Sequence, residues 1–429
     1  LSKSEKLQWV AQTFSPDASG FVRDFEEHLH VNPKIQELYD EFSENTLTNF
    51  YMPYGVIPNV KINDEIYCVP MVIEESSVVA AAAKSAKFWL SRGGFRTEVV
   101  SMIKVGQVHF LWEGNPKDLL PKFDSLKARL IEETNDITSN MRKRGGGILD
   151  IEWVDMTHIE ANYYQLKATF DTCDSMGANF INSCLESFAR TLQNWLGEHT
   201  NFTEEAQRTT VVMSILSNYT PECRVRAEVT CPIEDLGEVE KGISAELFAF
   251  KFKQAVAIAR NDPHRATTHN KGVFNGIDAV ILATGNDFRA VEACGHTYAA
   301  RDGQYRSLTH CTTDNGIFRF WIDVPMAVGT VGGLTNLHPL VKRSLELLDN
   351  PNAERLMEIT AVIGLAQNFG AVKSLVTTGI QKGHMKMHLL NILRTFEASE
   401  SETDAAVEHF KDNVVSVSAV RDLITTLRK

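Results

Sequence analysis

The sequence has 429 residues, of which 43% are hydrophobic and 23% are charged, and its net charge is −12 at pH 7. This size and composition predict a globular protein of two or three domains, and the negative charge argues against nucleic acid or an anionic membrane as a partner. The seven cysteines include no C-x-x-C pair, which favours a reducing, cytoplasmic compartment. We recognise no signal peptide, and no uncharged run approaches the ~20 residues of a membrane-spanning helix.

The first hundred residues predict a helical arm, two strands and a helix. Residues 1–48 are polar with mixed charge and read as a surface helical arm or a dimer-building segment. The strands and the helix are predicted at residues 60–62, 66–73 and 78–90. Ser76 or Ser77 is the expected N-cap of that helix. Glu75 then lies just outside a helix N-terminus, either to complement the helix dipole or to act as a general acid or base.

Residues 102–217 predict an inserted α+β module. Its expected elements follow a strand-helix-strand-strand-helix-strand order, with one long helix over residues 116–141. The run Asp174-Ser175-Met176-Gly177-Ala178-Asn179 leads into the second helix. Small residues there allow backbone N–H groups to approach a pyrophosphate, or they allow a tightly packed helix start. Asp150 is a candidate partner for a ribose hydroxyl, or a turn residue.

Beyond residue 220 the pattern predicts a second mixed region with a cation and a carboxylate at its centre. A loop is expected over residues 263–275, and Lys271 lies between two turn signals within it. An apolar run, residues 277–283, follows, and Asp287 then opens a helix over residues 288–301. Where water is scarce, such a pair can shift each other's pKa values. The alternative is a structural salt bridge.

The C-terminal part predicts a hinge and a helical segment. Thr377-Thr378-Gly379 is the expected hinge, and His384 follows a glycine a few residues later. His384 and His388 are one helical turn apart, a spacing that can bind zinc, but no third ligand is placed. His384 is therefore a candidate proton donor on a closing flap.

Together these stretches resemble one family, the class II, bacterial and archaeal type of 3-hydroxy-3-methylglutaryl-coenzyme A (HMG-CoA) reductase. The most specific matches are Arg265-Ala-Thr-Thr-His-Asn-Lys271-Gly, Ala283-Thr-Gly-Asn-Asp287, Glu74-Glu75-Ser76-Ser77, Asp174 to Asn179, Gly364-Leu-Ala-Gln-Asn368 and Gly383-His384-Met385. They lie within a resemblance that runs from about residue 44 to residue 388. The chain departs from the usual family pattern with Ser76 for proline, with Ser175 for alanine, and with Thr46-Leu47-Thr48 where a glycine is usual.

The resemblance implies a role for each matched residue. Lys271 stabilises the oxyanion, Glu75 handles the proton on the reacting oxygen, Asp287 hydrogen-bonds the lysine, and His384 protonates the departing thiolate. The implied substrate contacts are Ser77, Asn218, Arg265, Asn275 and Gln367. The implied cofactor contacts are Asp150, Asp174, Met176, Gly177, Ala178 and Asn179.

The resemblance also implies the architecture and the reaction. It implies an α+β protein with a large HMG-CoA-binding domain (1–101 and 218–376), an inserted ferredoxin-like, non-Rossmann NAD(P)-binding domain (102–217) and a C-terminal helical flap (377–429). The implied reaction converts HMG-CoA to mevalonate and coenzyme A, or the reverse, with two NADH or NADPH and no metal. The implied enzyme is a cytoplasmic homodimer or larger assembly with its active site at the subunit interface. The alternatives are another coenzyme A-thioester oxidoreductase on the same scaffold and a catalytically silent binding protein.

Overall fold

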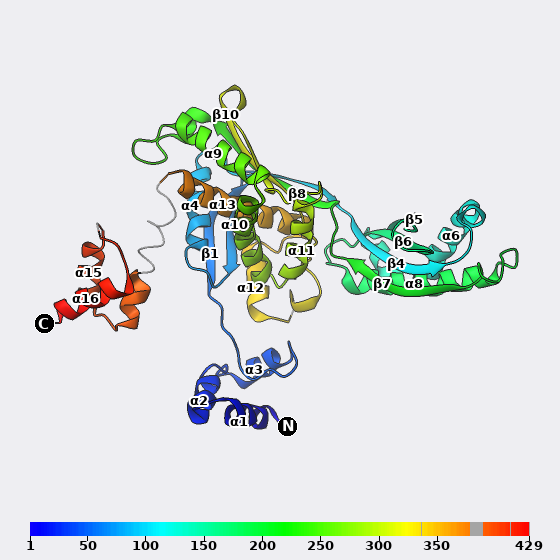
Figure 1. Cartoon of the computed structure of the whole chain (residues 1–429), viewed down its shortest axis with the longest axis horizontal. Coiled ribbons are helices and arrows are strands. Elements are labelled where there is room, and N and C mark those ends of the chain that lie inside the picture. Colours follow the sequence, from blue (N-terminus) through cyan, green and yellow to red (C-terminus); the bar gives the residue numbers. More distant parts are fainter. Residues whose placement is uncertain (336, 378–388, 412, 429) are drawn as a thin grey trace. The chain divides into compact units, whose positions relative to one another are not determined.

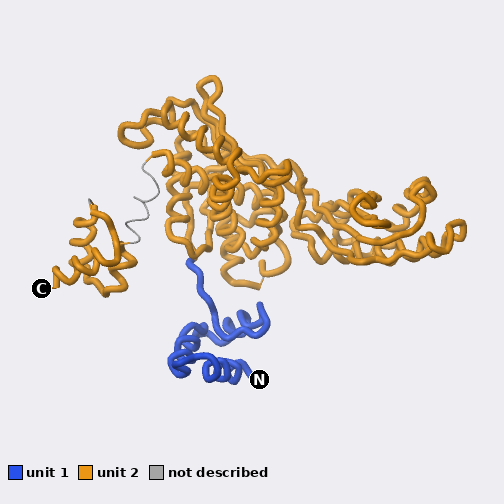
Figure 2. The backbone as a smooth tube through the Cα atoms, viewed as in Figure 1, with its two compact units in different colours: residues 1–53 blue, residues 54–429 orange. Residues whose placement is uncertain are grey.

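The structure is a computed structural model that describes residues 1–335, 337–377, 389–411 and 413–428. Its internal contacts divide the chain into two compact units, residues 1–53 and residues 54–429 (Figure 2). The first unit holds three short helices, α1 (Lys3–Phe14), α2 (Ala18–Glu27) and α3 (Pro33–Asp40). Each begins after a polar N-cap residue whose side chain accepts a backbone N–H, so the helices predicted for this segment are confirmed.

A four-stranded antiparallel sheet occupies the middle of the sequence (Figure 1). Its strands are β4 (Lys104–Trp112), β5 (Gly147–Asp155), β6 (Tyr163–Asp171) and β7 (Thr209–Ser217), in the order β5-β6-β4-β7. Helix α8 (Ala178–Glu198) connects β6 to β7, and helical segments connect β4 to β5. This is the ferredoxin-like order of elements that the sequence predicted. The sheet and α8 share a hydrophobic core of their own, which includes Phe110, Leu166 and Phe188.

The single long helix predicted over residues 116–141 is wrong. The segment forms α5 (Pro116–Leu119), a 3-10 turn (Leu120–Lys122), α6 (Phe123–Glu133) and α7 (Asn135–Lys143). Pro121 lies in the 3-10 turn, and proline has no N–H to continue an α-helical ladder. Apolar residues recur at the helical period on both sides of this break, so the sequence pattern does not reveal it.

A second four-stranded sheet and a hairpin contribute to a second hydrophobic core, which is the larger of the two described so far. The sheet contains β3 (Arg96–Met102), β8 (Cys223–Pro232), β10 (Ile317–Pro325) and β9 (Thr309–Thr312), in the order β3-β8-β10-β9. The hairpin pairs β1 (Tyr54–Ile62) with β2 (Glu65–Val72). β1 begins before the predicted strand because the chain passes Pro58 at an irregularity, where the pairing register shifts between Ile57 and Val60.

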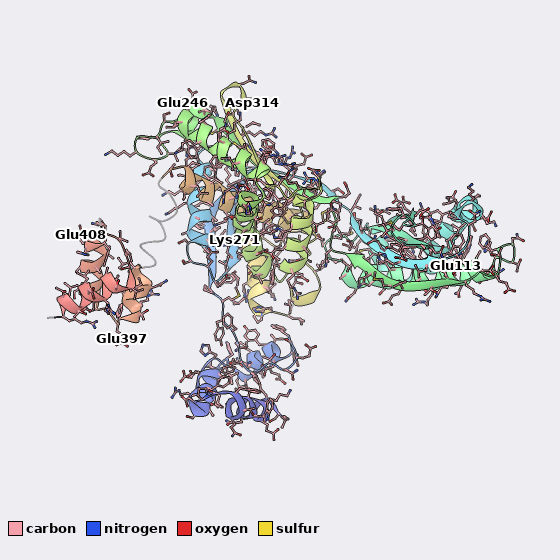
Figure 3. All side chains as sticks on the ribbon, in the orientation of Figure 1. Glu113, Glu246, Lys271, Asp314, Glu397 and Glu408 are labelled. Atoms are coloured by element: carbon pink, nitrogen blue, oxygen red, sulfur yellow. The ribbon has the colours of Figure 1, made fainter. Side chains whose placement is uncertain are left out.

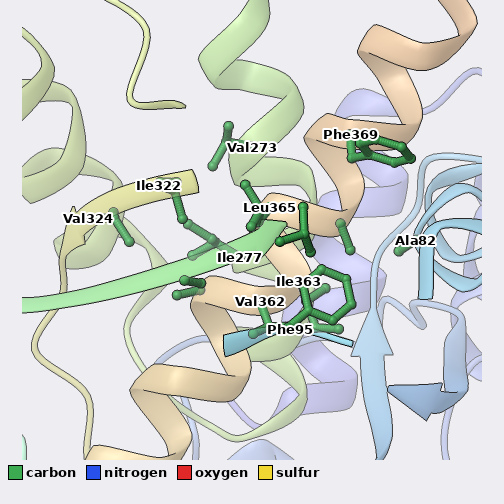
Figure 4. Packing of buried hydrophobic residues seen from close by; sticks show 14 of the residues in the cluster. Ala82, Phe95, Val273, Ile277, Ile322, Val324, Val362, Ile363, Leu365 and Phe369 are labelled. Carbon is green, nitrogen blue, oxygen red and sulfur yellow. The ribbon is translucent and has the colours of Figure 1, made fainter. Parts of the chain in front are cut away.

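Helices complete this core. They are α4 (Val78–Leu90), α9 (Ala245–Asn261), α10 (Pro263–Ala283), α11 (Phe288–Ala299), α12 (Pro339–Leu347) and α13 (Ala353–Val376), with 3-10 turns at Ile233–Leu236, Asp314–Gly316 and Gly333–Thr335. Side chains of α10, α13 and β10 interdigitate, with Val273, Ile277, Ile322 and Leu365 among them (Figure 4). Helix α13 is long and apolar enough to cross a membrane, but 72% of its most apolar window is buried, as in the core helix of a folded domain.

The loop predicted over residues 263–275 is also wrong, because these residues form the first part of α10. Asp262 is its N-cap and accepts from His264 N at 3.0 Å, and Pro263 occupies the first turn, a strong start signal. Gly276 follows Asn275 in a pair of residues that is typical of turns, but here it allows close helix packing. A Cβ atom at Gly276 would lie 2.6 Å from the backbone oxygen of Ile363 in α13, so only glycine fits this crossing.

The C-terminal residues that the structure describes are helical. They comprise residues 389–395, α15 (Glu400–His409) and α16 (Val417–Leu427). Leu393, Ala406 and Val420 are buried in a small apolar cluster that these helices share. His384 and His388 lie outside the described residues.

Candidate active site

Glu75 lies in the turn between β2 and α4. Strand β2 ends at Val72 and α4 begins at Val78, so Glu75 precedes the helix as predicted. Ser77 is the N-cap residue, but its φ angle is +74° and its hydroxyl makes no capping hydrogen bond. A left-handed conformation is unusual for serine, and it is found where surrounding structure enforces it, often at functional sites. The Ser77 hydroxyl is therefore available to another partner.

Lys271 meets Glu75 across the groove between α10 and this turn. Lys271 Nζ lies 2.5 Å from Glu75 Oε2, and Asn275 Nδ2 donates to the same oxygen at 3.1 Å. Lys271 and Asn275 are one helical turn apart on α10, so both face the carboxylate. Figure 3 labels Lys271 on the ribbon of α10. The structure thus brings together two of the four predicted catalytic residues.

The Lys271–Glu75 pair is partly exposed to solvent. The side chain of Lys271 is 57% exposed and that of Glu75 is 39% exposed, so neither charge is withdrawn from water. Exposed ion pairs contribute little to stability, typically about 0–1 kcal/mol. A structural salt bridge is therefore a weak explanation for the pair, and both groups remain accessible to a substrate.

A cleft of about 490 Å³ opens around the pair. Six of the predicted catalytic and substrate-contacting residues line it, namely Glu75, Ser77, Arg265, Lys271, Asn275 and Gln367. These residues come from the turn before α4, from α10 and from α13, which are far apart in the sequence. Packing of α10 against α4 and α13 therefore forms one face of the site from three of the predicted motifs.

Two lining residues have polar atoms with no partner among the described residues. Arg265 is partly buried and makes no ion pair there, and burial lowers its pKa from the ordinary value. Gln367 is 5% exposed, and its Oε1 accepts no hydrogen bond. A buried acceptor without a partner is costly, so a ligand that donates to Gln367 Oε1 would be favoured in this cleft. A cation and an acceptor suit a ligand that carries a carboxylate and a hydroxyl.

Asp287 does not join the pair within one chain. It is the N-cap of α11 and accepts from the backbone N–H groups of Arg289 at 3.1 Å and Ala290 at 3.2 Å. Its other partner is the Arg289 side chain. Burial acts to raise the pKa of Asp287, but these hydrogen bonds outweigh it and leave the pKa below its ordinary value. Asp287 comes after Ala283, the last residue of α10. Ala283 lies about 18 Å along the helix axis from Lys271, at 1.5 Å per residue.

The predicted cofactor loop opens helix α8. Gly177 is the N-cap with φ +88°, and a Cβ atom there would lie 2.4 Å from Thr172 Cγ2, so the turn requires glycine. The first turn of α8 carries no acidic residue, and no side chain caps it. Its N–H groups therefore form a positive pole that fits a diphosphate. This geometry makes the loop suitable for a nicotinamide dinucleotide.

The other predicted contacts lie at different places around this loop. Asp174 Oδ1 accepts the N–H of Ala353 at 2.9 Å, so this carboxylate anchors the loop to the start of α13. Asn218 lines a small pocket together with Met176 and Ala178. Asp150 lies on β5, where its carboxylate contacts Lys127.

Three lysines near these features were not foreseen. Lys84 and Lys373 also line the cleft, and burial lowers the pKa of Lys373. Lys84 follows Ser77 by two helical turns, a spacing that could have indicated it. Lys104 is 2% exposed beneath the cofactor loop and donates to Ser175 O at 3.1 Å. A lone lysine at the start of a strand carries no sequence signal for such a role.

Comparisons of the sequence match this chain to one family of enzymes. The family model described as hydroxymethylglutaryl-coenzyme A reductase matches residues 4–389. A curated 3-hydroxy-3-methylglutaryl-coenzyme A reductase from Archaeoglobus fulgidus is 36% identical over 398 residues, covering 91% of this chain and 86% of the relative.

Solved structures from Streptococcus pneumoniae are similar along the whole chain. A 3-hydroxy-3-methylglutaryl-coenzyme A reductase superposes with a TM-score of 0.73 at 36% identity, covering 100% of this chain and 98% of that one. A class II enzyme bound to NADPH in open conformations has a TM-score of 0.72 at 35% identity and covers 100% of both chains. The extent of these matches shows that the chain belongs to the hydroxymethylglutaryl-coenzyme A reductase family.

Proposed function

We propose that this reductase acts on HMG-CoA at the Lys271–Glu75 pair and forms mevalonate and free coenzyme A with two NADH or NADPH per turnover. The observation that carries the proposal is the 2.5 Å contact between Lys271 Nζ and Glu75 Oε2 inside an open cleft of about 490 Å³. A cation and a proton donor that are in contact inside one accessible cleft suit a carbonyl group whose oxygen first becomes anionic and then takes a proton.

Lys271 stabilises the negative charge that develops on the reacting oxygen. The nicotinamide cofactor supplies one hydride to the thioester carbon and, in a second round, one hydride to the aldehyde carbon. Both transfers place charge on the same oxygen, so one ammonium group serves both steps. A preorganised donor of this kind contributes about 3–4 kcal/mol to transition-state stabilisation.

Two acids manage the protons. Glu75, whose carboxylate contacts Lys271, protonates the reacting oxygen when the aldehyde becomes an alcohol. Between the two reductions the carbon–sulfur bond breaks and the thiolate of coenzyme A leaves. We assign protonation of that thiolate to His384, the matching histidine of the family motif. A separate acid for the sulfur leaves Glu75 free to act at the oxygen.

The unpaired groups of the cleft supply substrate contacts. The Arg265 guanidinium suits the carboxylate of the glutaryl group, and Ser77, Asn275 and Gln367 lie around the same space. Lys84 and Lys373 give the far side of the cleft positive charge, which complements the phosphates of coenzyme A. We place Asn218 at the boundary between this cleft and the cofactor loop.

We assign Asp287 to the site of the partner subunit. Its distance along α10 from Lys271 prevents contact within one chain, whereas a two-fold axis that pairs two α10 helices antiparallel would bring each Asp287 toward the other Lys271. In this proposal the homodimer supplies the aspartate that one chain does not bring to Lys271. Residues 1–101 and 218–376 hold HMG-CoA, residues 102–217 hold the cofactor, and residues 377–429 form the flap of a cytoplasmic enzyme.

The stoichiometry of the reaction tests the proposed function. Purified protein with HMG-CoA should oxidise two NAD(P)H for each thiol released, measured by absorbance at 340 nm and by a thiol reagent in one sample. One cofactor per thiol would indicate an enzyme that stops at the aldehyde. Absence of both signals with either cofactor would reject the proposal and favour a binding protein.

A further inference from the structure

An ion pair at the edge of the β5-β6-β4-β7 sheet is not explained by the reaction described above. Lys127 on α6 contacts Asp150 Oδ1 on β5, the edge strand of that sheet. The backbone N–H of Ile151 donates to the same oxygen at 2.9 Å. The lysine contact lowers the pKa of Asp150 below its ordinary value. In the part of the chain that the structure describes, Asp150 Oδ2 has no partner.

The pair lies at the end of the sheet that carries the cofactor loop. Gly147 on β5 pairs with Asp171 on β6, and the loop to Gly177 begins directly after Asp171. The connector before β5 touches this loop, because Cys173 Sγ donates to the backbone oxygen of Arg144 at 3.4 Å. Asp150 is three residues into the same strand. A dinucleotide with its diphosphate at the start of α8 can therefore extend its adenosine end toward Asp150.

A carboxylate and a cation at the adenosine ribose have opposite preferences. The carboxylate accepts a hydrogen bond from the free 2′-hydroxyl of NADH and repels the 2′-phosphate of NADPH. A cation nearby accommodates that phosphate. Arg142 is turned away, since its guanidinium donates to Asn135 Oδ1 at 2.7 Å. Lys127 is the cation that the structure places in direct contact with Asp150.

We propose that Lys127 sets the selectivity of this enzyme between NADPH and NADH. The inference rests on the proposed function, because it requires a nicotinamide dinucleotide at the α8 loop. Lys127 offsets the charge of Asp150 and offers its remaining ammonium hydrogens to a 2′-phosphate, while Asp150 Oδ2 accepts a 2′-hydroxyl. The pair thus admits both cofactors, and its two members favour different ones.

Opposite substitutions should change the selectivity in opposite directions. In Lys127→Met an uncompensated carboxylate remains, and the ratio of kcat/KM for NADPH to that for NADH should fall about tenfold or more. In Asp150→Asn the lysine is freed, and the same ratio should rise. Calorimetric titration with 2′,5′-ADP and with 5′-ADP should show the same two shifts in the ratio of dissociation constants.

A second lysine–carboxylate pair, two residues after Asp150 on β5, provides the control. Glu152 on β5 and Lys167 on β6 lie 3.9 Å apart, and Lys167→Met removes a similar charge from the same sheet. This control should leave both ratios unchanged. Loss of folded protein alters both cofactors equally, so the ratios report recognition and not stability.

The outcomes separate this inference from the proposed function. Ratios that stay constant in both variants, or that move in the same direction, overturn the role of Lys127 while activity of the unaltered enzyme upholds the function. Failure of the unaltered protein to bind either ADP probe or to oxidise either cofactor rejects the cofactor site itself. Opposite shifts with an unmoved Lys167→Met control establish Lys127 as the selectivity residue.

Discussion

Replacing Lys271 with alanine is expected to lower kcat by about 10³-fold or more while leaving the fold intact. The change removes the cation that meets Glu75 at 2.5 Å and thereby the donor for the oxyanion in both reductions. Stability should change little, because the lysine side chain is 57% exposed and exposed pairs contribute about 0–1 kcal/mol. Steady-state assays and thermal denaturation of the purified variant measure the two effects.

Lys87→Ala is the matched control for this variant. Lys87 is an exposed lysine on α4, the helix that follows the Glu75 turn, and it lies outside the residues that line the cleft. We expect normal turnover from it. A Lys271→Ala enzyme that retains most of its activity would show that the oxyanion is stabilised by another group.

Replacing His384 with glutamine should separate the two half-reactions. Without the acid for the thiolate, reduction of HMG-CoA should fall about 10²-fold or more. Reduction of free mevaldehyde should remain close to normal, because that substrate has no thiolate to protonate. Initial rates with the two substrates, measured on the same preparation, test this assignment.

The control for the histidine is His388, four residues later in the sequence. His388→Gln removes a second imidazole from the same segment and should affect neither substrate. Equal loss with both substrates in His384→Gln would contradict a role confined to the sulfur and would indicate a general effect on closure of the segment.

The order of helices and strands was predictable because the spacing of apolar residues and the helix-capping residues depend on each segment alone. The alternation of strands and helices through residues 104–217 follows from such patterns, and so does the position of Glu75 before α4. The same local signals failed where tertiary packing decides. At Gly276 the glycine marks a close helix crossing and not a turn, and the Asp262-Pro263 start signal that precedes it was overlooked.

The site was predictable from motifs only as a set of residues, not as a geometry. Spacing along the chain placed Lys271 near the carboxylate of Asp287, and only the family resemblance placed Glu75, nearly two hundred positions earlier, at the same reacting oxygen. The structure pairs Lys271 with Glu75. Lys104 and Lys127 gain their positions from packing between elements, and single lysines carry no periodic signal. Within one chain Asp287 contacts Arg289, so its proposed role beside the partner subunit's Lys271 requires a second subunit.

Mixing two inactive variants tests the composition of the active site most directly. If Lys271 and Glu75 of one subunit act with Asp287 of its partner, Lys271→Ala and Asp287→Asn homodimers should each be inactive. Subunit exchange in an equal mixture should then restore about one quarter of the unaltered activity, because half of the dimers are mixed and each has one intact site. A mixture that forms mixed dimers but stays inactive would contradict the shared site.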